Sequence, residues 1–290
     1  MRILLCGANG FVGRHLETVL TQTGHEVWRG VRRPVAARDI ALDYTRDLLP
    51  AHWIERLDGI DVLINAVGVL RDTPATPMAA IHDAAPRALF AACKDAGVGR
   101  VVQLGALGVG GPVTTTYFTS REAAIAALQH PGNPFRHLLL RPSLLYGADG
   151  ASTRLFLALA RLPLLALPAL PGSRLQPAHV DDLCDAVARW LDDPSATSQD
   201  IAVVGSASTD LRGLIASYRA QLGHRPARVL SLPEALTTLA ARLGDAIPAS
   251  LLCTDTLRML KAGSTADPAA FAALLGRTPC AFDTFLHDRE

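Results

Sequence analysis

The sequence predicts an α/β fold: a doubly wound parallel sheet with helices on both faces and a smaller C-terminal lobe. Two observations lead to this prediction. Short apolar runs rich in β-branched residues alternate with longer helical patterns along the first half of the chain, as in right-handed βαβ units. After Pro142 the pattern changes, because proline and glycine become frequent through Gly172. We therefore expect a first domain over residues 1–142 and a smaller mixed lobe over residues 143–290, with some elements returning to the sheet.

The elements of the first half follow one another in a regular order. The expected strands are Arg2 to Cys6, His25 to Val31, Ile60 to Val67, Arg100 to Leu104 and Phe135 to Arg141. The expected helices are Phe11 to Thr23, Met78 to Ala96 and Tyr117 to Gln129. Because parallel strands need long crossover connections, this alternation predicts a parallel sheet that is covered on both faces.

The second half gives weaker signals. Residues 155–172 are mostly apolar, but one arginine and three prolines interrupt them. A membrane-spanning helix needs about 20 uninterrupted apolar residues, so we interpret this stretch as a proline-broken pocket wall rather than a membrane contact. A helix is expected to begin near Asp181, where an acidic residue suits the first turn, and a strand is expected over Asp200 to Val204.

Composition excludes several classes of protein. The chain has 290 residues, 49% of them hydrophobic, and a formal net charge of +1, so it can bury a large core and has no nucleic-acid footprint. Its five cysteines form no CxxC pair, which argues against a disulfide framework or a zinc site and favours a reducing, cytoplasmic compartment. We expect no signal peptide and no transmembrane segment. The stretch His179-Val180-Asp181-Asp182 is interpreted as a helix cap, and no metal site is expected.

A glycine-rich turn follows the first strand and opens the first helix. Gly7 permits the sharp turn, Gly10 permits close approach of the backbone to a pyrophosphate, and Gly13 permits close packing of helix on strand. The helix N-terminus then offers unpaired N–H groups to the phosphates. The sequence therefore predicts a Rossmann-type dinucleotide site, in which Asn9, Phe11 and Val12 also contact the cofactor.

The end of the second strand indicates which dinucleotide is bound. An NAD site usually has an acidic residue about 20 residues after the turn, whereas this chain has Arg32 and Arg33 there. Guanidinium groups grip a 2′-phosphate, so we expect NADP(H) rather than NAD(H). The alternative is that an arginine-rich chain places these residues by chance. Asp43 is a weaker candidate for contact with the adenine.

Small residues follow the expected strand Ile60 to Val67. Ala66, Val67 and Gly68 leave room for the chain to pass beside a cofactor. By themselves they are equally compatible with an ordinary strand end.

Taken together, these parts resemble the short-chain dehydrogenase/reductase superfamily, in its extended and atypical branches (NAD-dependent epimerase/dehydratase-like, NmrA-like). Within it the chain looks most similar to the relatives of the nucleotide-binding accessory subunit of respiratory complex I. The motifs that carry the resemblance are Gly7-Ala8-Asn9-Gly10-Phe11-Val12-Gly13, Asn65-Ala66-Val67-Gly68, Tyr117 with Arg121, Arg141-Pro142-Ser143-Leu144-Leu145-Tyr146-Gly147 and Gln176-Pro177-Ala178-His179-Val180-Asp181-Asp182.

The resemblance implies a catalytic tyrosine, a lysine four residues later and a serine about a dozen residues earlier. Tyr117 matches the tyrosine, but Arg121 stands at the lysine position and Gly105 at the serine position. Arginine keeps the positive charge, whereas glycine removes the hydroxyl that would orient a substrate oxygen. The hydroxyls nearest in sequence belong to residues 114–116 and to Ser143. The remaining cofactor contacts that the resemblance implies are Gly105, Tyr117, Arg121, Pro142 and Leu144.

Two functions therefore stay open. The first is an NADP(H)-dependent oxidoreductase, or an epimerase or dehydratase, acting on a small or hydrophobic carbonyl substrate with Tyr117 and Arg121 as catalytic residues. The second is a protein that binds NADP(H) without turnover, as a regulator or as a structural subunit of a larger complex. Gly105 favours the second, and Tyr117 favours the first.

Overall fold

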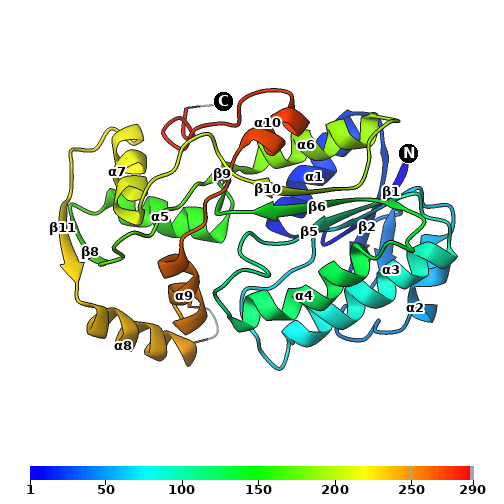
Figure 1. The fold of residues 1–290 in the computed structure, drawn as a ribbon, viewed down its shortest axis with the longest axis horizontal. Coiled ribbons are helices and arrows are strands. Elements are labelled where there is room, and N and C mark those ends of the chain that lie inside the picture. Colours follow the sequence, from blue (N-terminus) through cyan, green and yellow to red (C-terminus); the bar gives the residue numbers. More distant parts are fainter. Residues whose placement is uncertain (248–249, 288–290) are drawn as a thin grey trace. The chain divides into compact units, whose positions relative to one another are not determined.

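The structure is a computed structural model that describes residues 1–247 and 250–287 (Figure 1). The chain divides into two compact units. The first unit comprises Met1–Arg141 and Cys184–Ile201, and the second comprises Pro142–Leu183 and the described residues from Ala202 onward. The first unit is therefore interrupted in sequence, and a helix and a strand from the later part of the chain belong to it.

A seven-stranded sheet forms the centre of the first unit, and it confirms the predicted fold class. Its order is β10-β6-β5-β4-β1-β2-β3, and β1 pairs in parallel with both β2 and β4. The winding reverses between β1 and β4, which is the position where open α/β sheets bind ligands. The strands are β1 (Arg2–Cys6), β2 (Glu26–Val31), β3 (Asp39–Ala41), β4 (Val62–Asn65), β5 (Arg100–Leu104), β6 (Arg136–Pro142) and β10 (Gln199–Val203).

Helices cover both faces of this sheet, as predicted. Figure 1 shows α1 (Phe11–Gln22) and α6 (Val180–Asp192) over one face. The other face carries α2 (Ala51–Ile54), α3 (Ala85–Asp95) and α4 (Thr116–Leu128). Two short elements complete this unit, the 3-10 turn η1 (Glu55–Leu57) and the π-helical η2 (Ala79–Ala84). No helix among the described residues is long and apolar enough to cross a membrane.

The core of the first unit lies between the sheet and α3 and α4. Leu4, Leu63 and Val101 project from three neighbouring strands and pack against Leu89 and Leu128 of the helices. All five side chains are fully buried. Mostly apolar strands of this kind are expected for a parallel sheet that is covered on both faces.

The second unit contains shorter elements and a separate core. Its strands form two small parallel sheets, in which β11 pairs with β8 and β7 pairs with β9. The core includes Tyr146, Tyr218 and Phe285. Its elements are β7 (Leu145–Tyr146), α5 (Ala151–Arg161), β8 (Leu164–Pro168), β9 (Ala178–His179), α7 (Leu211–Gln221), β11 (Arg228–Leu232), α8 (Glu234–Asp245), α9 (Thr254–Ala262) and α10 (Ala269–Leu275).

Residues 155–172, which the sequence predicts to form a proline-broken wall, contain most of helix α5 and strand β8. Helix α5 continues to Arg161, and Pro163 and Pro168 stand immediately before strand β8 and at its end. Proline is compatible with these positions because it need not donate a ladder hydrogen bond there. Pro163 and Pro168 thus mark the two ends of a regular strand.

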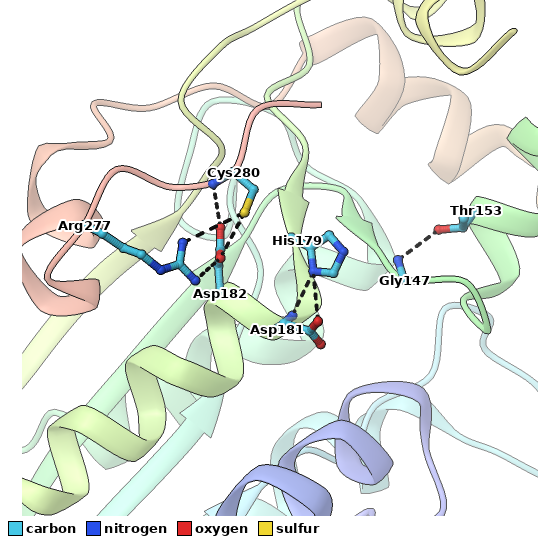
Figure 2. A network of polar contacts seen from close by, with 7 residues as sticks. All are labelled: Gly147, Thr153, His179, Asp181, Asp182, Arg277 and Cys280. Atoms are coloured by element: carbon cyan, nitrogen blue, oxygen red, sulfur yellow. Dashed lines mark hydrogen bonds and ion pairs between the residues drawn. The ribbon is translucent and has the colours of Figure 1, made fainter. Parts of the chain in front are cut away.

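A buried carboxylate holds the C-terminal segment to the rest of the second unit (Figure 2). Asp182, in the first turn of α6, is fully buried and accepts a hydrogen bond from Arg277 Nη2 at 2.6 Å. The backbone N–H of Cys280 donates to the same carboxylate at 2.7 Å. Beside it, His179 Nδ1 accepts a hydrogen bond from the backbone N–H of Asp181 at 3.2 Å. These contacts are those of a structural junction at a helix start.

Gly13 gives a direct test of the turn between β1 and α1. A Cβ added at Gly13 would lie 2.0 Å from the carbonyl oxygen of Gly7, which is backbone and cannot move aside cheaply. We expect Gly13→Ala to lower the free energy of unfolding by about 1–3 kcal/mol, measured by urea denaturation.

The matched control is Gly99→Ala, because its Cβ would meet nothing closer than 3.8 Å. That variant should stay within about 0.5 kcal/mol of the wild type. Equal stability of the two variants would contradict the close approach.

Candidate functional site

The functional site is built at the carboxyl ends of β1 and β4. Cys6 at the end of β1 is the register partner of Gly30 in β2 and of Asn65 in β4. Beyond the strands, Gly7 N–H donates to the carbonyl of Gly30 at 3.3 Å, and Ala66 N–H donates to that of Cys6 at 3.0 Å. The glycine-rich turn and the Ala66–Gly68 segment therefore leave the sheet side by side.

The turn has the geometry that glycine alone satisfies. Gly7 has φ of 85°, and a Cβ there would lie 2.9 Å from the carbonyl carbon of Ala66. Gly10 is the N-cap of α1 and has no side chain to cap the first N–H groups. Phe11 and Val12 begin the helix, so their N–H groups stand at its positively polarised end. Such an end is suited to an anionic group.

Asn9 of the same turn is fixed to the second strand. Its side-chain oxygen accepts a hydrogen bond from Arg29 Nη2 at 2.6 Å, and Arg29 also pairs with Glu17 and Asp39. Phe11 packs edge-on against His15. Polar contacts of Arg29 therefore connect the turn and α1 to β2.

Arg32 and Arg33 lie directly after β2 and are both exposed. Asp43 lies near enough for the charge of Arg32 to act on it. Partial burial acts to raise the pKa of Asp43, but hydrogen bonds from Thr45 and the charges of Arg46 and Arg32 outweigh it and lower the pKa. Asp43 therefore carries a negative charge at neutral pH and is engaged with its own loop.

A chain of buried hydrogen bonds runs beneath the strand ends. The Tyr44 hydroxyl donates to Asn65 Oδ1 at 2.8 Å, Asn65 Nδ2 donates to Gln103 Oε1 at 2.8 Å, and Gln103 Nε2 donates to the Leu104 carbonyl at 2.7 Å. Cys6 adjoins this chain, and burial raises the pKa of its thiol to about 12. Burial also raises the pKa of Tyr44. The groups of this chain are therefore uncharged at neutral pH.

Arg121 brings a positive charge to the end of this chain. The residue is only 6% exposed. Its Nη1 donates to the Leu104 carbonyl at 3.2 Å, and its Nη2 contacts His82 Nε2 at 3.2 Å. A Cβ on Gly68 would lie 2.8 Å from Nη2, so the guanidinium would have to shift if this residue carried a side chain. Its buried Nε has no hydrogen-bond partner among the described residues.

His82 on η2 links the guanidinium to α4. His82 Nε2 accepts a hydrogen bond from the Val69 N–H at 3.0 Å as well as from Arg121, so the ring proton is assigned to Nδ1. Nδ1 lies 2.8 Å from Ser120 Oγ, which in turn donates to the Tyr117 carbonyl at 3.1 Å. Burial and then the charge of Arg121 lower the pKa of His82 to about 3. The ring is therefore neutral at physiological pH.

Tyr117 stands above Arg121 in the first turn of α4. The guanidinium carbon lies 4.6 Å from the centre of the tyrosine ring, in a cation–π contact, and the His82 ring meets it edge-on at 5.6 Å. The side chain is half-buried, and no described residue hydrogen-bonds its hydroxyl. Thr115, the preceding N-cap, uses its own hydroxyl to accept from the Phe118 N–H. The phenol is held by its ring and leaves its hydroxyl available.

Gly105 lies on the same side, buried at the end of β5. Its N–H donates to the Leu140 carbonyl at 2.7 Å, and a Cβ there would lie 3.2 Å from a methyl group of Leu139. None of the hydroxyls considered from the sequence replaces a serine here. Thr114 and Thr116 are exposed, Thr115 caps α4, and the Ser143 hydroxyl donates to the Ser264 carbonyl within the second unit.

A small cavity brings part of this set together. Its lining residues are Asn65, Val67, Ile81, His82, Pro86, Gln103, Gly105, Arg121, Ala124 and Ile125. Pro142 and Leu144 belong to the second unit, where Pro142 ends β6 and the Leu144 carbonyl accepts from the Ala178 N–H.

Sequence reasoning missed His82, Ser120 and the Asn65–Gln103 pair as site residues. The pair could have been found, because Asn65 and Gln103 are polar residues within the apolar runs of two successive expected strands. His82 had no such signal, since it reaches the site from a π-helical turn that the sequence pattern does not distinguish from an ordinary helix.

The chain matches a known protein family over most of its length. Residues 3–205 match the family model described as the NAD dependent epimerase/dehydratase family. The chain belongs to this family. The resemblance found in the sequence is thereby confirmed.

One sequence relative and two solved structures of similar fold illustrate what the chain is similar to. The chain is similar to a ceramide reductase of Caulobacter vibrioides, 28% identical over 254 residues that cover 84% of this chain and 77% of the relative. Its fold matches a human epimerase family protein solved with NADPH, with a TM-score of 0.77, 18% identity and full coverage of both chains. It also matches an NADPH-dependent quinone oxidoreductase of Escherichia coli, with a TM-score of 0.73, 20% identity and coverage of 99% and 98%.

The residues present fit the dinucleotide that the family name implies. The turn presents the N-terminus of α1, whose first N–H groups are not capped by a side chain because Gly10 is the N-cap residue. At the other end, Arg121 Nε is a buried donor that lacks a protein acceptor among the described residues. A buried donor without an acceptor is costly, so a ligand oxygen at this place would be stabilising.

The neutral state of His82 makes stability depend on pH. Its pKa is about 6.5 in the unfolded chain and about 3 in the folded protein, so the unfolded state binds more protons between these values. This part of the stability is fully present above pH 6.5 and is lost as the pH falls toward 3. We expect the unfolding free energy of the wild type to fall more steeply over this window than that of His82→Gln, by up to about 1.4 kcal/mol per pH unit.

Urea denaturation at a series of pH values between 7 and 4 measures the two slopes, since carboxylates contribute equally to both proteins. His130→Gln replaces an exposed histidine and should keep the wild-type slope. Parallel curves for His82→Gln and the wild type would show that His82 is not held neutral.

Proposed function

We propose that this chain binds NADP(H) in preference to NAD(H) and interconverts a hydrophobic carbonyl compound and its alcohol. The observation that carries the proposal is the arrangement of Arg121 and Tyr117: a buried guanidinium lies under a tyrosine ring whose hydroxyl is unengaged by the described residues. Arg121 lies beside Gly68 and lines the same small cavity as Gly105, at the carboxyl edge of the sheet. Membership in the NAD dependent epimerase/dehydratase family supports the same activity.

The residues that would hold the dinucleotide come from four segments. The N–H groups after Gly10 suit the pyrophosphate, and the exposed pair Arg32 and Arg33 suits a 2′-phosphate. Gly68 permits close passage of the chain, and Arg121 Nε is a donor for a ribose hydroxyl. When bound, the nicotinamide ring supplies or accepts a hydride.

Tyr117 is the group that would move the proton. Its hydroxyl would donate a proton to a carbonyl oxygen in reduction, and its phenolate would accept one from an alcohol in oxidation. The positive charge of Arg121 lies close to the ring and would stabilise negative charge as it develops on the oxygen. Leu104 and His82 keep the guanidinium in place through neutral acceptors, so its charge is not cancelled by a carboxylate among its hydrogen-bond partners.

The substrate class rests on the relatives and on Gly105. One relative is named a ceramide reductase and another an NADPH-dependent quinone oxidoreductase, and both names denote lipid-soluble compounds. With glycine at position 105, Tyr117 is the hydroxyl that remains to orient a substrate oxygen. A substrate positioned mainly by apolar contacts suits a site with few polar groups.

A second function has one specific observation in its favour. At position 105, glycine replaces the serine whose hydroxyl the family's chemistry uses. If this loss abolishes catalysis, the chain would bind NADP(H) as a regulator or as a structural subunit. Turnover decides between the two functions, because both require cofactor binding and the first alone requires proton transfer by Tyr117.

Removal of one hydroxyl tests the catalytic role. Tyr117→Phe should lower turnover of a long-chain ketone with NADPH by about 10²–10⁴-fold and leave calorimetric binding of NADPH unchanged. The matched control is Tyr218→Phe, a core tyrosine of the second unit, which should keep full turnover. Ordinary turnover by Tyr117→Phe would contradict the proposal. NADPH binding with no turnover of a broad carbonyl panel by the wild type would establish the second function instead.

Charge reversal tests the cofactor preference. The wild type should bind NADPH more tightly than NADH in calorimetric titration, and Arg32→Glu should reverse this order, because a carboxylate repels a 2′-phosphate and accepts from a 2′-hydroxyl. Arg212→Glu, at an exposed position in the second unit, changes charge equally and should leave the preference intact. An unchanged preference in Arg32→Glu would rule out this assignment.

A further inference from the structure

The outer face of the small β8–β11 sheet exposes leucines. The register pairs Leu164 with Arg228 and Ala166 with Leu230, and partners in a parallel pair point to the same side. Leu164 is 57% exposed and Leu230 is 59% exposed, whereas Leu165 and Leu167 point to the other side and are buried in the core of the second unit. The sheet therefore has a packed inner face and an apolar outer face.

Helix α8 follows β11 directly along the chain (Figure 1). Its leucines are also exposed. Leu236, Leu239 and Leu243 lie on one face at spacings of three and four, and they are 54%, 55% and 64% exposed. The buried residues of the helix are instead Thr237, Ala241 and Gly244. A helix that packs against its own protein normally buries its leucines, so α8 is oriented the opposite way.

Positive charge stands at the start of the two strands, because residues 161–168 and 225–232 contain three arginines and no aspartate or glutamate. Arg161, Arg225 and Arg228, which precede or begin the two strands, are exposed. Glu234, at the start of α8, is paired with Lys261 Nζ at 2.5 Å. The acid closest to these strands in sequence is therefore neutralised.

We call these residues the basic apolar surface: Leu164, Leu230, Leu236, Leu239 and Leu243 with Arg161, Arg225 and Arg228. We propose that the basic apolar surface docks the second unit on the interface of an anionic lipid bilayer. Leucines enter the boundary between headgroups and acyl chains, and guanidinium groups meet lipid phosphates. A second copy of the chain is a poorer occupant, because a two-fold interface would oppose this surface to itself, and none of the residues that define it is a carboxylate that could pair with its arginines. The inference does not depend on the proposed enzymatic activity.

Vesicle flotation with the full-length protein tests the docking. At physiological salt the wild type should float with vesicles of phosphatidylcholine and phosphatidylglycerol and remain behind with phosphatidylcholine alone. Arg228→Gln should lower the ratio of bound to free protein about fivefold. Leu239→Ser combined with Leu243→Ser should lower it at least about tenfold, because the lost apolar burial is larger.

Two matched controls separate this surface from general stickiness. Leu49→Ser changes a leucine of the first unit that is also 59% exposed, and Arg38→Gln changes an exposed arginine of that unit. Both should float like the wild type, and circular dichroism confirms that each variant is folded. The proposal is overturned by failure of the wild type to float, by equal binding to neutral vesicles, or by equal loss in the controls. Self-association abolished by the leucine variants, without vesicle binding, would identify a second copy as the occupant.

Discussion

The buried guanidinium of Arg121 sets the requirements that the rest of the candidate site meets. A cation at 6% exposure must find acceptors, and it obtains them from the Leu104 carbonyl and from His82 Nε2. This arrangement favours glycine at position 68, since a Cβ would meet Nη2, and a neutral imidazole at His82. Lysine could not make the same planar contacts, because its three donors radiate from a single nitrogen. The residues around position 121 therefore fit an arginine, which stands where the family resemblance implies a lysine.

The partners of Arg121 are all uncharged. A carbonyl, an imidazole and a phenol ring surround the guanidinium, and the thiol and tyrosine hydroxyl on the adjoining hydrogen-bond chain are also neutral. A buried charge without a counter-ion is destabilising by itself. Proteins retain such groups where an anionic or developing negative charge arrives from outside. The electrostatics of the site thus favour a functional role for Arg121 over a purely structural one. This holds whether the protein turns over a substrate or only binds a cofactor.

Local sequence signals predicted the parts that depend on local chemistry. The apolar run of β4, the glycine spacing of the β1–α1 turn and the family motifs were sufficient to predict the parallel sheet and the family. They were not sufficient for His82, because a π-helical turn aims its side chain and no sequence period marks that turn. Within residues 155–172 they did not separate Leu164 from Leu165, because the two residues look alike in sequence and pairing with β11 decides which is buried. The C-terminal helices likewise depend on tertiary partners.

The carboxylate of Asp182 ties the first turn of α6 to a segment that lies 95 to 98 residues later along the chain. During synthesis on a ribosome, strands β1 to β6 emerge in one continuous stretch and have most of their sheet partners early. Asp182 must wait until Arg277 and Cys280 leave the exit tunnel before these partners reach it. The second unit can therefore complete this contact only after residues 277–280 have been made, and a chain that stops before them would lack these two partners of the carboxylate.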